Sequence, residues 1–504
     1  YLALRDDLEL NGHIFASETD TETLAHLVEM NYAGDLVAAV RATLRGIEGA
    51  FSIAVVHAGE PGLIVAAKRT SPLIVGRNDN ATFLASDPTA LLQHTREVTH
   101  VLDDQIVEIR RDGYTITTFD GAPAEGTPIT IDWDVGAAEK AGYPWFMLKE
   151  IYEQPQAVES TLRGRTLPNG FLTLDELRLS DEEIRSIDKV FVVACGTAFH
   201  AGLVAKYAIE HWTRLPVEIE VASEFRYRDP VLDRDTLVIA VSQSGETIDT
   251  LEAVRFARAQ RAKVVAVTNV VGSSIARESD AVLYTHAEPE ICVLATKTFT
   301  TQLVALKLLA LFLAQVRGSK YPNEIRAIVA EMRRLPELLR ETLTLRDRVK
   351  ELAREIADAP TVLFVGRHVG YPMALEGALK LKEVSYVHAE GFPAGELKHG
   401  PIALIDKGVP VVAIATQCHV YPKVLSNIQE IKARGAFVIA ICSAGDAEEF
   451  GRHVDRVIEV PLTEELLVPG LVSVPLQLLA YEVAILRGCD VDQPRNLAKS
   501  VTVE

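Results

Sequence analysis

The sequence predicts an α/β protein whose larger part repeats one pattern twice, preceded by a smaller α+β block. From about residue 143 onward, apolar β-branched runs alternate with helical stretches, which is typical of parallel sheets covered by helices on both faces. The runs VFVVACG, TLVIAVSQSGE and AKVVAVTN recur in the same order as TVLFVGRHVG, VPVVAIATQ and AFVIAICSAG, so we expect two similar α/β subdomains. Before residue 135, short strand-like runs separated by turn clusters indicate antiparallel hairpins.

The expected elements follow from these patterns in order. A helical stretch over Asp20–Leu44 precedes the strand-like runs FSIAVVH, GLIVAAK, PLIVG, ATFLAS and QIVEIRR. The segment Phe119–Gly142 has weak periodicity and resembles a linker, and a long helical stretch over Asn323–Ile356 connects the two subdomains. The expected domains are 1–135 for the first block, 136–145 for the linker, 146–330 and 331–495 for the two α/β subdomains, and 496–504 for a terminal tail.

Composition limits the possible functions. The chain has 504 residues, 48% of them hydrophobic and 24% charged, which predicts two to four domains and excludes a disordered or fibrous protein. The net charge of −19 repels nucleic acid and anionic lipid, so neither is an expected partner. The apolar runs Leu303–Val316 and Gly470–Leu486 are short and interrupted, so we expect buried helices. Five scattered cysteines fit a reducing cytoplasm; we predict no metal site and no cofactor.

The clearest chemical motif is SQSGET, Ser242–Thr247, which follows a strand-like run and opens a helical stretch. Its hydroxyls and the amides at the helix N-terminus can surround a phosphate, although a serine here also fits a simple helix cap. The chain has no GxxxxGKS motif, so a nucleoside triphosphate is not indicated. The second copy has Thr416, Gln417, Cys418 and His419 at this place, so a single phosphate ligand is expected in the first copy.

Three further clusters hold ionisable residues that can take part in catalysis. Lys380 and Glu383 are three residues apart on a helical stretch, which suits either a surface ion pair or a reactive pair. His399, followed by Gly-Pro, is expected on a loop, as either a solvated or a functional residue. In the closing segment DQPRNLAKS, Lys499 is either an exposed charge or an amine that forms a Schiff base with a sugar carbonyl.

Together and in this order, SQSGET, KLKE, AGELKHGP and the closing DVDQPRNLAKSVTVE closely resemble the family of glutamine–fructose-6-phosphate aminotransferases (isomerizing). The first block resembles the later part of that family's glutaminase domain, in SETDTE, EGAFSIAVV and SPLIVG. The resemblance implies tandem sugar-isomerase subdomains preceded by a partial glutaminase domain of the N-terminal-nucleophile type. It also implies a homodimer that converts fructose 6-phosphate and glutamine into glucosamine 6-phosphate and glutamate, the first step of hexosamine synthesis.

The resemblance implies a role for each matching residue. Glu383 would move a proton between C1 and C2 of the sugar, Lys380 would adjust the charge state of Glu383, and Lys499 would bind the C2 carbonyl as a Schiff base. His399, reaching into the neighbouring subunit's site, would open the sugar ring, and Asp20 would bind the amino group of glutamine. The residues implied to hold the sugar phosphate are Thr197, Ser242, Gln243, Ser244, Thr247, Val293, Ala295 and Ala498.

This chain departs from the family pattern at several positions. The family's GVASTKAF reads CVLATKTF from Cys292, so Ala295 replaces a sugar-facing serine and loses a hydrogen bond worth about 1 kcal/mol. Leu294 is bulkier than the family's alanine, and Ala198 stands where many members have serine. The family's nucleophilic cysteine belongs to a segment that would precede Tyr1, so we expect the chain as written not to hydrolyse glutamine.

Two other functions remain open at this point. A sugar-phosphate isomerase that does not aminate its substrate would keep the sugar site but would not need the glutaminase-like first block. A sugar-phosphate sensor without turnover would need only the SQSGET loop. The presence of Glu383, His399 and Lys499 favours an enzyme over a sensor.

Overall fold

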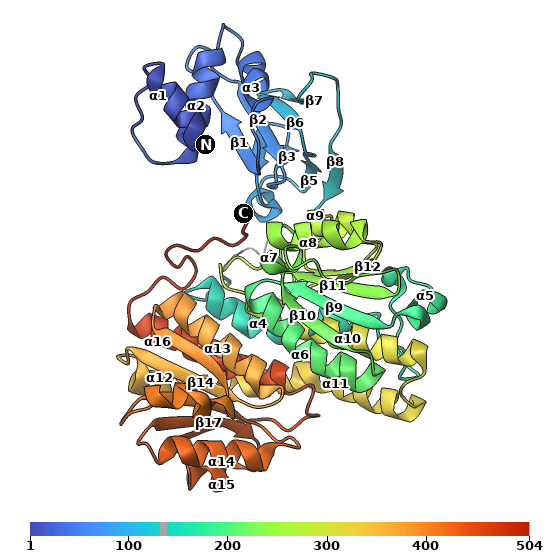
Figure 1. Ribbon diagram of the computed structural model, residues 1–504, viewed down its shortest axis with the longest axis vertical. Helices are drawn as coiled ribbons and strands as arrows, with labels where there is room; N and C mark the ends of the chain where they lie inside the picture. Colours follow the sequence, from blue (N-terminus) through green and yellow to red (C-terminus); the bar gives the residue numbers. More distant parts are fainter. Residues whose placement is uncertain (132–138, 503–504) are drawn as a thin grey trace. The chain divides into compact units, whose positions relative to one another are not determined.

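The computed structural model describes residues 1–131 and 139–502, and the chain forms two compact units (Figure 1). The N-terminal unit comprises Tyr1–Ala138 with Val501–Glu504, and the C-terminal unit comprises Glu139–Ser500. Part of the expected linker, 136–145, lies outside the described residues, and the rest of it, 139–145, belongs to the C-terminal unit.

The described part of the N-terminal unit contains two antiparallel four-stranded sheets and three α-helices. The strand orders are β1-β2-β6-β7 and β4-β3-β5-β8. Its helices are α1 (Leu2–Leu10), α2 (Asp20–Asn31) and α3 (Leu36–Leu44). Its strands are β1 (Phe51–Val55), β2 (Ile64–Arg69), β3 (Ile74–Arg77), β4 (Thr82–Ala85), β5 (Glu97–His100), β6 (Gln105–Arg110), β7 (Gly113–Thr118) and β8 (Thr127–Thr130).

Two expectations for this unit are wrong. The stretch Asp20–Leu44 is two helices, because the chain turns between them and the Asp35 side chain caps α3 by accepting a hydrogen bond from the Ala38 amide. The segment Phe119–Gly142 is not only a linker, since β8 lies within it and pairs with β5. Strands this short carry too few alternating residues to be distinguished from a loop in the sequence.

The C-terminal unit consists of two lobes, each with a five-stranded parallel sheet. The strand orders are β10-β9-β11-β12-β13 and β15-β14-β16-β17-β18, so the second lobe repeats the topology of the first. The first lobe's strands are β9 (Lys189–Ala194), β10 (Val217–Val221), β11 (Thr236–Ser242), β12 (Lys263–Thr268) and β13 (Ala281–Tyr284). The second lobe's strands are β14 (Thr361–Gly366), β15 (His388–Pro393), β16 (Pro410–Ala415), β17 (Phe437–Ser443) and β18 (Arg456–Val460).

Helices cover both faces of these sheets; in the second lobe, α13 and α14 lie on opposite sides of the strands (Figure 1). The main helices are α4 (Phe146–Leu162), α5 (Asp181–Ser186), α6 (Gly196–Thr213), α7 (Ala222–Phe225), α8 (Ile248–Ala259), α9 (Ser274–Glu278), α10 (Lys297–Arg317), α11 (Pro322–Leu343), α12 (Arg346–Ile356), α13 (Gly370–Ser385), α14 (Tyr421–Lys432), α15 (Ala447–Gly451) and α16 (Pro469–Leu486). The stretch expected as one helix over Asn323–Ile356 is two helices, α11 and α12, with a break at Thr344–Leu345.

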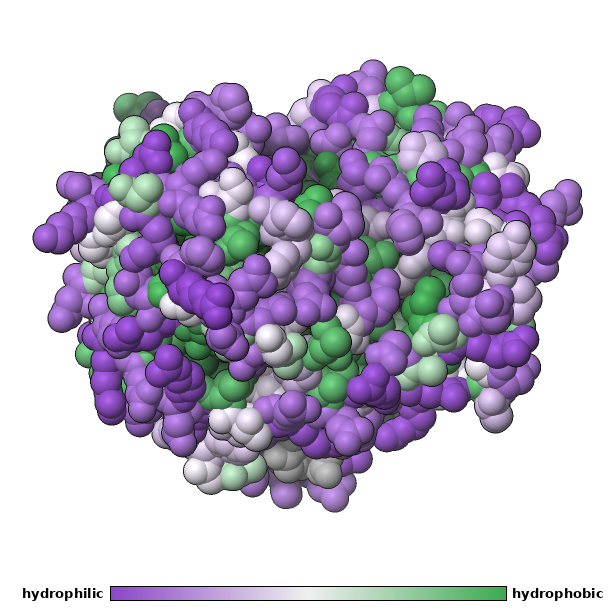
Figure 2. All heavy atoms as spheres, turned by 90° about the horizontal axis from the view of Figure 1, so that it is seen from below, coloured by the Kyte–Doolittle hydropathy of each residue, from purple (hydrophilic) through white to green (hydrophobic). Residues whose placement is uncertain are grey.

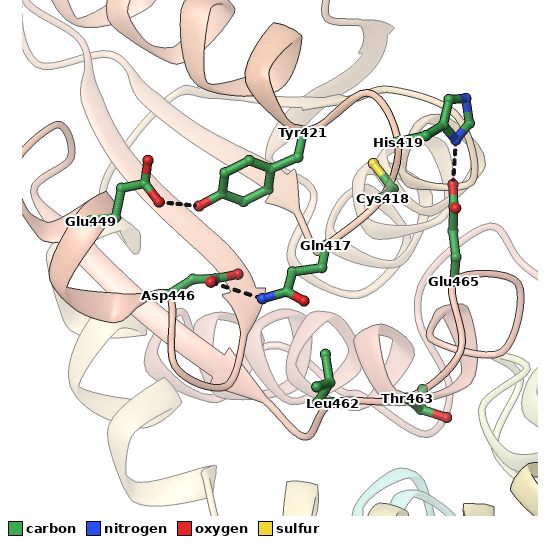
Figure 3. A pocket seen from close by; sticks show the side chains of 9 residues that line it. All are labelled: Gln417, Cys418, His419, Tyr421, Asp446, Glu449, Leu462, Thr463 and Glu465. Atoms are coloured by element: carbon green, nitrogen blue, oxygen red, sulfur yellow. Dashed lines mark hydrogen bonds and ion pairs between the residues drawn. The ribbon is translucent and has the colours of Figure 1, made fainter.

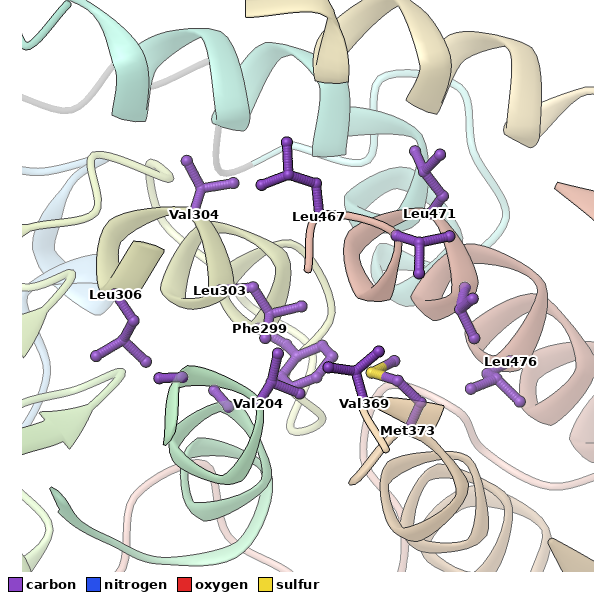
Figure 4. Close-up of a cluster of buried hydrophobic side chains, with 14 of the residues drawn as sticks. Val204, Phe299, Leu303, Val304, Leu306, Val369, Met373, Leu467, Leu471 and Leu476 are labelled. Carbon is purple, nitrogen blue, oxygen red and sulfur yellow. The ribbon is translucent and has the colours of Figure 1, made fainter. Parts of the chain in front are cut away.

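The two most apolar helices form the centre of the C-terminal unit. Helices α10 and α16 are long and apolar enough to cross a membrane, but 83% and 89% of their most apolar windows are buried inside the fold. Val204 of α6, Phe299 of α10, Met373 of α13 and Leu471 of α16 belong to one buried cluster (Figure 4). Helices α10 and α16 are therefore core helices, as expected. The face of the molecule in Figure 2, by contrast, is mostly hydrophilic, with hydrophobic side chains interspersed.

The sheet topology fixes where ligands can bind. In each lobe the second strand of the chain, β10 or β15, lies on one side of the first strand, and the third, β11 or β16, lies on its other side. The strand order therefore reverses between β9 and β11 and again between β14 and β16. Open α/β sheets bind ligands at the carboxyl ends of the strands beside such a reversal. Thr197 and the SQSGET loop follow β9 and β11, and so lie at the first of these two reversal points.

Candidate functional site

The SQSGET loop forms a compact turn between β11 and α8. Its hydroxyls face one another, with Ser242 Oγ 2.9 Å from Thr247 Oγ1, and the Gly245 amide donates to Ser242 Oγ at 3.0 Å. Gly245 has φ +66°, and a Cβ there would lie 2.0 Å from Ser273 Oγ, so only glycine fits. Ser244 Oγ accepts from the Glu246 amide and makes no capping box with Thr247. The loop thus gathers hydroxyls at a helix N-terminus, which suits a phosphate.

Helix α13 carries a row of three ionisable side chains, Glu376, Lys380 and Glu383, in the same C-terminal unit. Lys380 Nζ lies 2.6 Å from Glu383 Oε2 and 3.7 Å from Glu376 Oε1. Lys380 is only 1% exposed, so the alternative of a surface ion pair is wrong. Burial alone would lower the pKa of Lys380, but Glu383 and Glu376 outweigh it and the pKa is raised. Lys380 therefore remains charged beside Glu383.

A buried carboxylate joins the two lobes at this row. Glu376 Oε1 accepts from Thr197 Oγ1 at 3.1 Å, and Glu376 Oε2 lies 2.7 Å from His200 Nδ1. Thr197 and His200 belong to α6 of the first lobe, whereas Glu376 belongs to α13 of the second. Thr197, which follows β9, is thereby linked to the row of ionisable side chains on α13. Neither Glu376 nor His200 was singled out in the sequence, where an acid inside an apolar helix gives no chemical signal.

The terminal lysine is held by a second buried carboxylate. Lys499 Nζ donates to Glu290 Oε2 and to the Cys292 carbonyl, each at 2.7 Å, so it is not a free exposed charge. Glu290 also accepts from the Thr296 and Thr298 amides at 2.9 and 3.1 Å. Burial opposes ionisation of Glu290, but Lys499 and these hydrogen bonds outweigh it and lower its pKa. Glu290 is a site residue that the sequence did not reveal.

A third acid lies beside this pair in a different charge state. Glu150 Oε1 accepts from the Ile291 and Cys292 amides at 2.6 and 3.1 Å. Burial, followed by the charge of Glu290, raises the pKa of Glu150 to about 8. The neutral form of Glu150 therefore predominates at neutral pH, and the single negative charge on Glu290 is left to face Lys499.

The tail is anchored before it reaches Lys499. The Asp492 carboxylate accepts from the Phe146 and Met147 amides at the start of α4, both at 2.9 Å. The Asp492 carbonyl accepts from the Val293 amide at 3.0 Å, which places the tail along the CVLATKTF segment. Val293 and Ala295 are partly exposed on that segment.

Two predicted site residues lie apart from this arrangement. His399 ends the exposed 3-10 turn Glu396–His399, and no contact in the described chain joins it to Glu383 or Lys499. Asp20 belongs to the N-terminal unit, where it is the exposed first residue of α2. Ala498 is exposed beside Lys499. Within the described C-terminal unit, Glu376 links Thr197 to Lys380, which contacts Glu383. Lys499 lies along the segment that holds Val293 and Ala295.

Comparison with known proteins shows the family. The SIS domain family matches residues 183–312 and 355–487, and a glutamine amidotransferase domain family matches residues 1–93. A glutamine–fructose-6-phosphate aminotransferase (isomerizing) of Streptomyces coelicolor is 55% identical over 510 residues, which cover all of this chain and 83% of that protein. The chain belongs to the glutamine–fructose-6-phosphate aminotransferase family. The predicted resemblance and fold class are confirmed.

Other members of this aminotransferase family agree. A protein of the same name from Mycobacterium tuberculosis is 56% identical over 518 residues, covering all of this chain and 83% of that protein. Among solved structures, the C-terminal domain of glucosamine-fructose-6-phosphate aminotransferase from Francisella tularensis superposes with a TM-score of 0.68 at 42% identity. It covers 71% of this chain and 99% of that domain.

Proposed function

We propose that this protein aminates and isomerises fructose 6-phosphate, with glutamine as the nitrogen donor, to give glucosamine 6-phosphate and glutamate in amino-sugar synthesis. The relatives bear the name of this reaction. The observation that carries the proposal is the pair of lysine–carboxylate contacts, Lys380 with Glu383 and Lys499 with Glu290, in the unit that also holds the SQSGET loop. A sugar-phosphate sensor would need the loop but neither contact.

The chemistry follows from these groups. Ser242, Ser244 and Thr247 bind the phosphate, which leaves the other end of the open-chain sugar for the lysines. The Lys499 amine adds to the C2 carbonyl and expels water as a Schiff base, and ammonia then displaces Lys499 to leave a C2 imine. Glu383 removes a proton from C1 and returns one to C2, so that C1 becomes an aldehyde and C2 carries the amine. The charge on Lys380 favours the ionised form of Glu383, which is the form that accepts the proton.

His399 opens the sugar ring, and it does so from the neighbouring subunit of a homodimer. The support is its position on an exposed turn, without a contact to Glu383 or Lys499 in the described chain. In the N-terminal unit, Asp20 binds the amino group of glutamine. An acidic protein built around such a site works in the cytoplasm, where its phosphorylated substrate is found.

The decisive experiment measures product with two nitrogen sources. The purified protein is incubated with fructose 6-phosphate and either glutamine or ammonium, and amino sugar and glucose 6-phosphate are both quantified. We expect glucosamine 6-phosphate with ammonium, lost in Glu383→Gln but kept in Lys382→Gln, which changes the exposed neighbour on the same helix. Glucose 6-phosphate alone at saturating ammonium would assign a bare isomerase, and no turnover at all would assign a sensor.

A further inference from the structure

The reversal point of the second lobe has lost its phosphate loop and gained a different set of side chains. His368 follows β14, His419 follows β16, and Glu465 follows β18, so all three stand at carboxyl ends of parallel strands. The strand order reverses between β14 and β16, which places the two histidines on either side of the reversal point. This is the position that Thr197 and the SQSGET loop occupy in the first lobe.

The three side chains converge on one point. Glu465 Oε1 lies 2.8 Å from His368 Nδ1 and 2.9 Å from His419 Nδ1, and one ligand atom from each residue lies within 4.8 Å of the others. The contact with His368 is not aligned as a hydrogen bond, and His368 Nδ1 is buried without a hydrogen-bond partner among the described residues. Two ligand atoms about 2.1 Å from a common ion are about 3 Å apart in neighbouring coordination positions.

A pocket lined by His419 and Glu465, but not by His368, adjoins this cluster and favours a cation over an anion. It has a volume of about 490 Å³, and Figure 3 shows His419 and Glu465 bonded to each other at one end of it. Its lining includes the carboxylates of Asp446 and Glu449 besides Glu465, and contains no lysine or arginine. A phosphate would be repelled here, although the first lobe's reversal point suits one.

We propose that His368, His419 and Glu465 bind a divalent transition-metal ion of the zinc class. Two imidazoles and one carboxylate are a donor set that such ions accept, with a remaining coordination position open to solvent in the pocket. The ion would join three loops of the second lobe, one of which leads directly into α13.

The test measures metal binding itself. The protein is stripped with a chelator and titrated with Co²⁺, whose visible absorption reports coordination, and with Zn²⁺ in competition with a colorimetric chelator. A second cluster, His13, His26 and Glu29 in the N-terminal unit, also brings ligand atoms together. All measurements are therefore made in a His26→Ala background, which removes one ligand of that cluster.

We expect one Co²⁺ per chain in this background, and an affinity that falls at least about 100-fold in His368→Ala and in His419→Ala. The matched control is His388→Ala, because His388 is an exposed histidine 3.7 Å from Glu390 that belongs to neither ligand cluster found among the described residues. The His419 side chain is 64% exposed, so its removal leaves the fold intact. Zn²⁺ should raise the melting temperature of the background protein but not of the His419→Ala variant.

Two results would overturn the proposal. The first is a background protein that binds neither Co²⁺ nor Zn²⁺ after stripping. The second is an affinity in the His368 and His419 variants that equals that of the His388→Ala control, which would place any bound ion elsewhere.

Discussion

Two lysines of the candidate site have similar contacts but different surroundings. Lys380 is 1% exposed and lies between Glu376 and Glu383, whereas the Lys499 side chain is 23% exposed and contacts Glu290. A fully enclosed amine cannot reach a substrate carbonyl, but it can hold a neighbouring carboxylate ionised. The accessible amine of Lys499 suits the covalent step, and the enclosed amine of Lys380 suits an electrostatic role.

The first prediction separates covalent chemistry from binding. Lys499→Arg keeps the charge but cannot form a Schiff base, so kcat should fall strongly while calorimetry still shows sugar-phosphate binding. Ser244→Ala removes a contact to a phosphate that does not change in the reaction. It should weaken binding by about 1–3 kcal/mol and leave kcat largely unchanged. Normal turnover in Lys499→Arg would make the tail a structural element only.

The second prediction concerns the carboxylate that holds Lys499. Glu290→Gln keeps the shape of the side chain but removes its charge, and a hydrogen bond between charged groups is worth about 1.5–3 kcal/mol, or about 10–150-fold in rate. We expect kcat for the ammonium reaction to fall by that factor, with sugar-phosphate affinity much less affected. An unchanged kcat would show that Lys499 does not depend on Glu290.

Glu150→Gln is the matched control for that variant. Because the pKa of Glu150 is raised to about 8, the amide imitates a side chain that is already neutral at pH 7, and kcat should be retained.

The same pKa shift makes stability depend on pH. Between pH 4.5 and about 8, the Glu150 carboxyl keeps its proton in the folded state but releases it in the unfolded state, so the wild type loses stability as pH rises through this window. The stability of Glu150→Gln relative to wild type should therefore increase from pH 4.5 to 8, as measured by denaturant unfolding.

At the scale of elements, one charge interrupts the central helix α10. Lys307 is 1% exposed in the middle of this apolar helix, and burial lowers its pKa to about 7. Glu464, whose own pKa is raised by burial, is the charge that partly offsets this effect. The helix therefore carries a charge at low pH that its packing disfavours.

The third prediction replaces that lysine. Below about pH 7, Lys307 is charged in both the folded and the unfolded state. From about pH 7 to 10.5, only the unfolded state keeps the proton on Lys307. The free energy of unfolding of the wild type therefore rises with pH across this range. Lys307→Met should raise the free energy of unfolding by about 1–4 kcal/mol below pH 7, with a smaller gain towards pH 10.5. Lys423 is an exposed residue of α14, so Lys423→Met is the control for the loss of one positive charge. Equal gains in both variants would contradict the prediction.

The sequence was sufficient for the three central strands of each sheet in the C-terminal unit, because buried parallel strands are continuous apolar runs. It did not indicate the edge strands β10, β15 and β18. Each strand of the repeated runs, such as β9 and β14, has its predicted place. Periodicity was insufficient where an element is short or where two helices adjoin, as at β8 and at the break between α11 and α12. Helical periodicity continues across a break of two residues, so only tertiary packing shows the change in direction.

At the scale of the whole molecule, no contact among the described residues joins His399 to Glu383 or Lys499 of its own chain. If each His399 serves the neighbouring site, a dimer of His399→Ala and Glu383→Gln subunits contains one site in which both residues are intact. The fourth prediction is that mixing these two inactive variants restores up to about a quarter to a half of the activity per site. Activity should be followed after subunit exchange, with each variant alone as the control. The absence of restoration would favour a site built within one chain.

The candidate site was only partly predictable, because some of its residues depend on partners that are distant in the sequence. Motifs identified the residues that we propose to touch the substrate, such as Lys499 and Ser244, because they lie in segments that resemble those of a known family. Glu290 and Glu376 act through other side chains, and their function depends on burial and on partners more than a hundred positions away. No local pattern encodes such a partner, so these carboxylates become apparent only in three dimensions.

The anchor at Asp492 has a consequence for how the terminal lysine works. Asp492 is fixed to the start of α4, and Lys499 follows it by only seven positions, so this segment is a short tether. A group on a short flexible tether has an effective concentration on the order of millimolar at its site. In the proposed reaction, Lys499 therefore leaves Glu290, reacts with the carbonyl of a bound sugar and returns, while the tether keeps the amine at the site between turnovers.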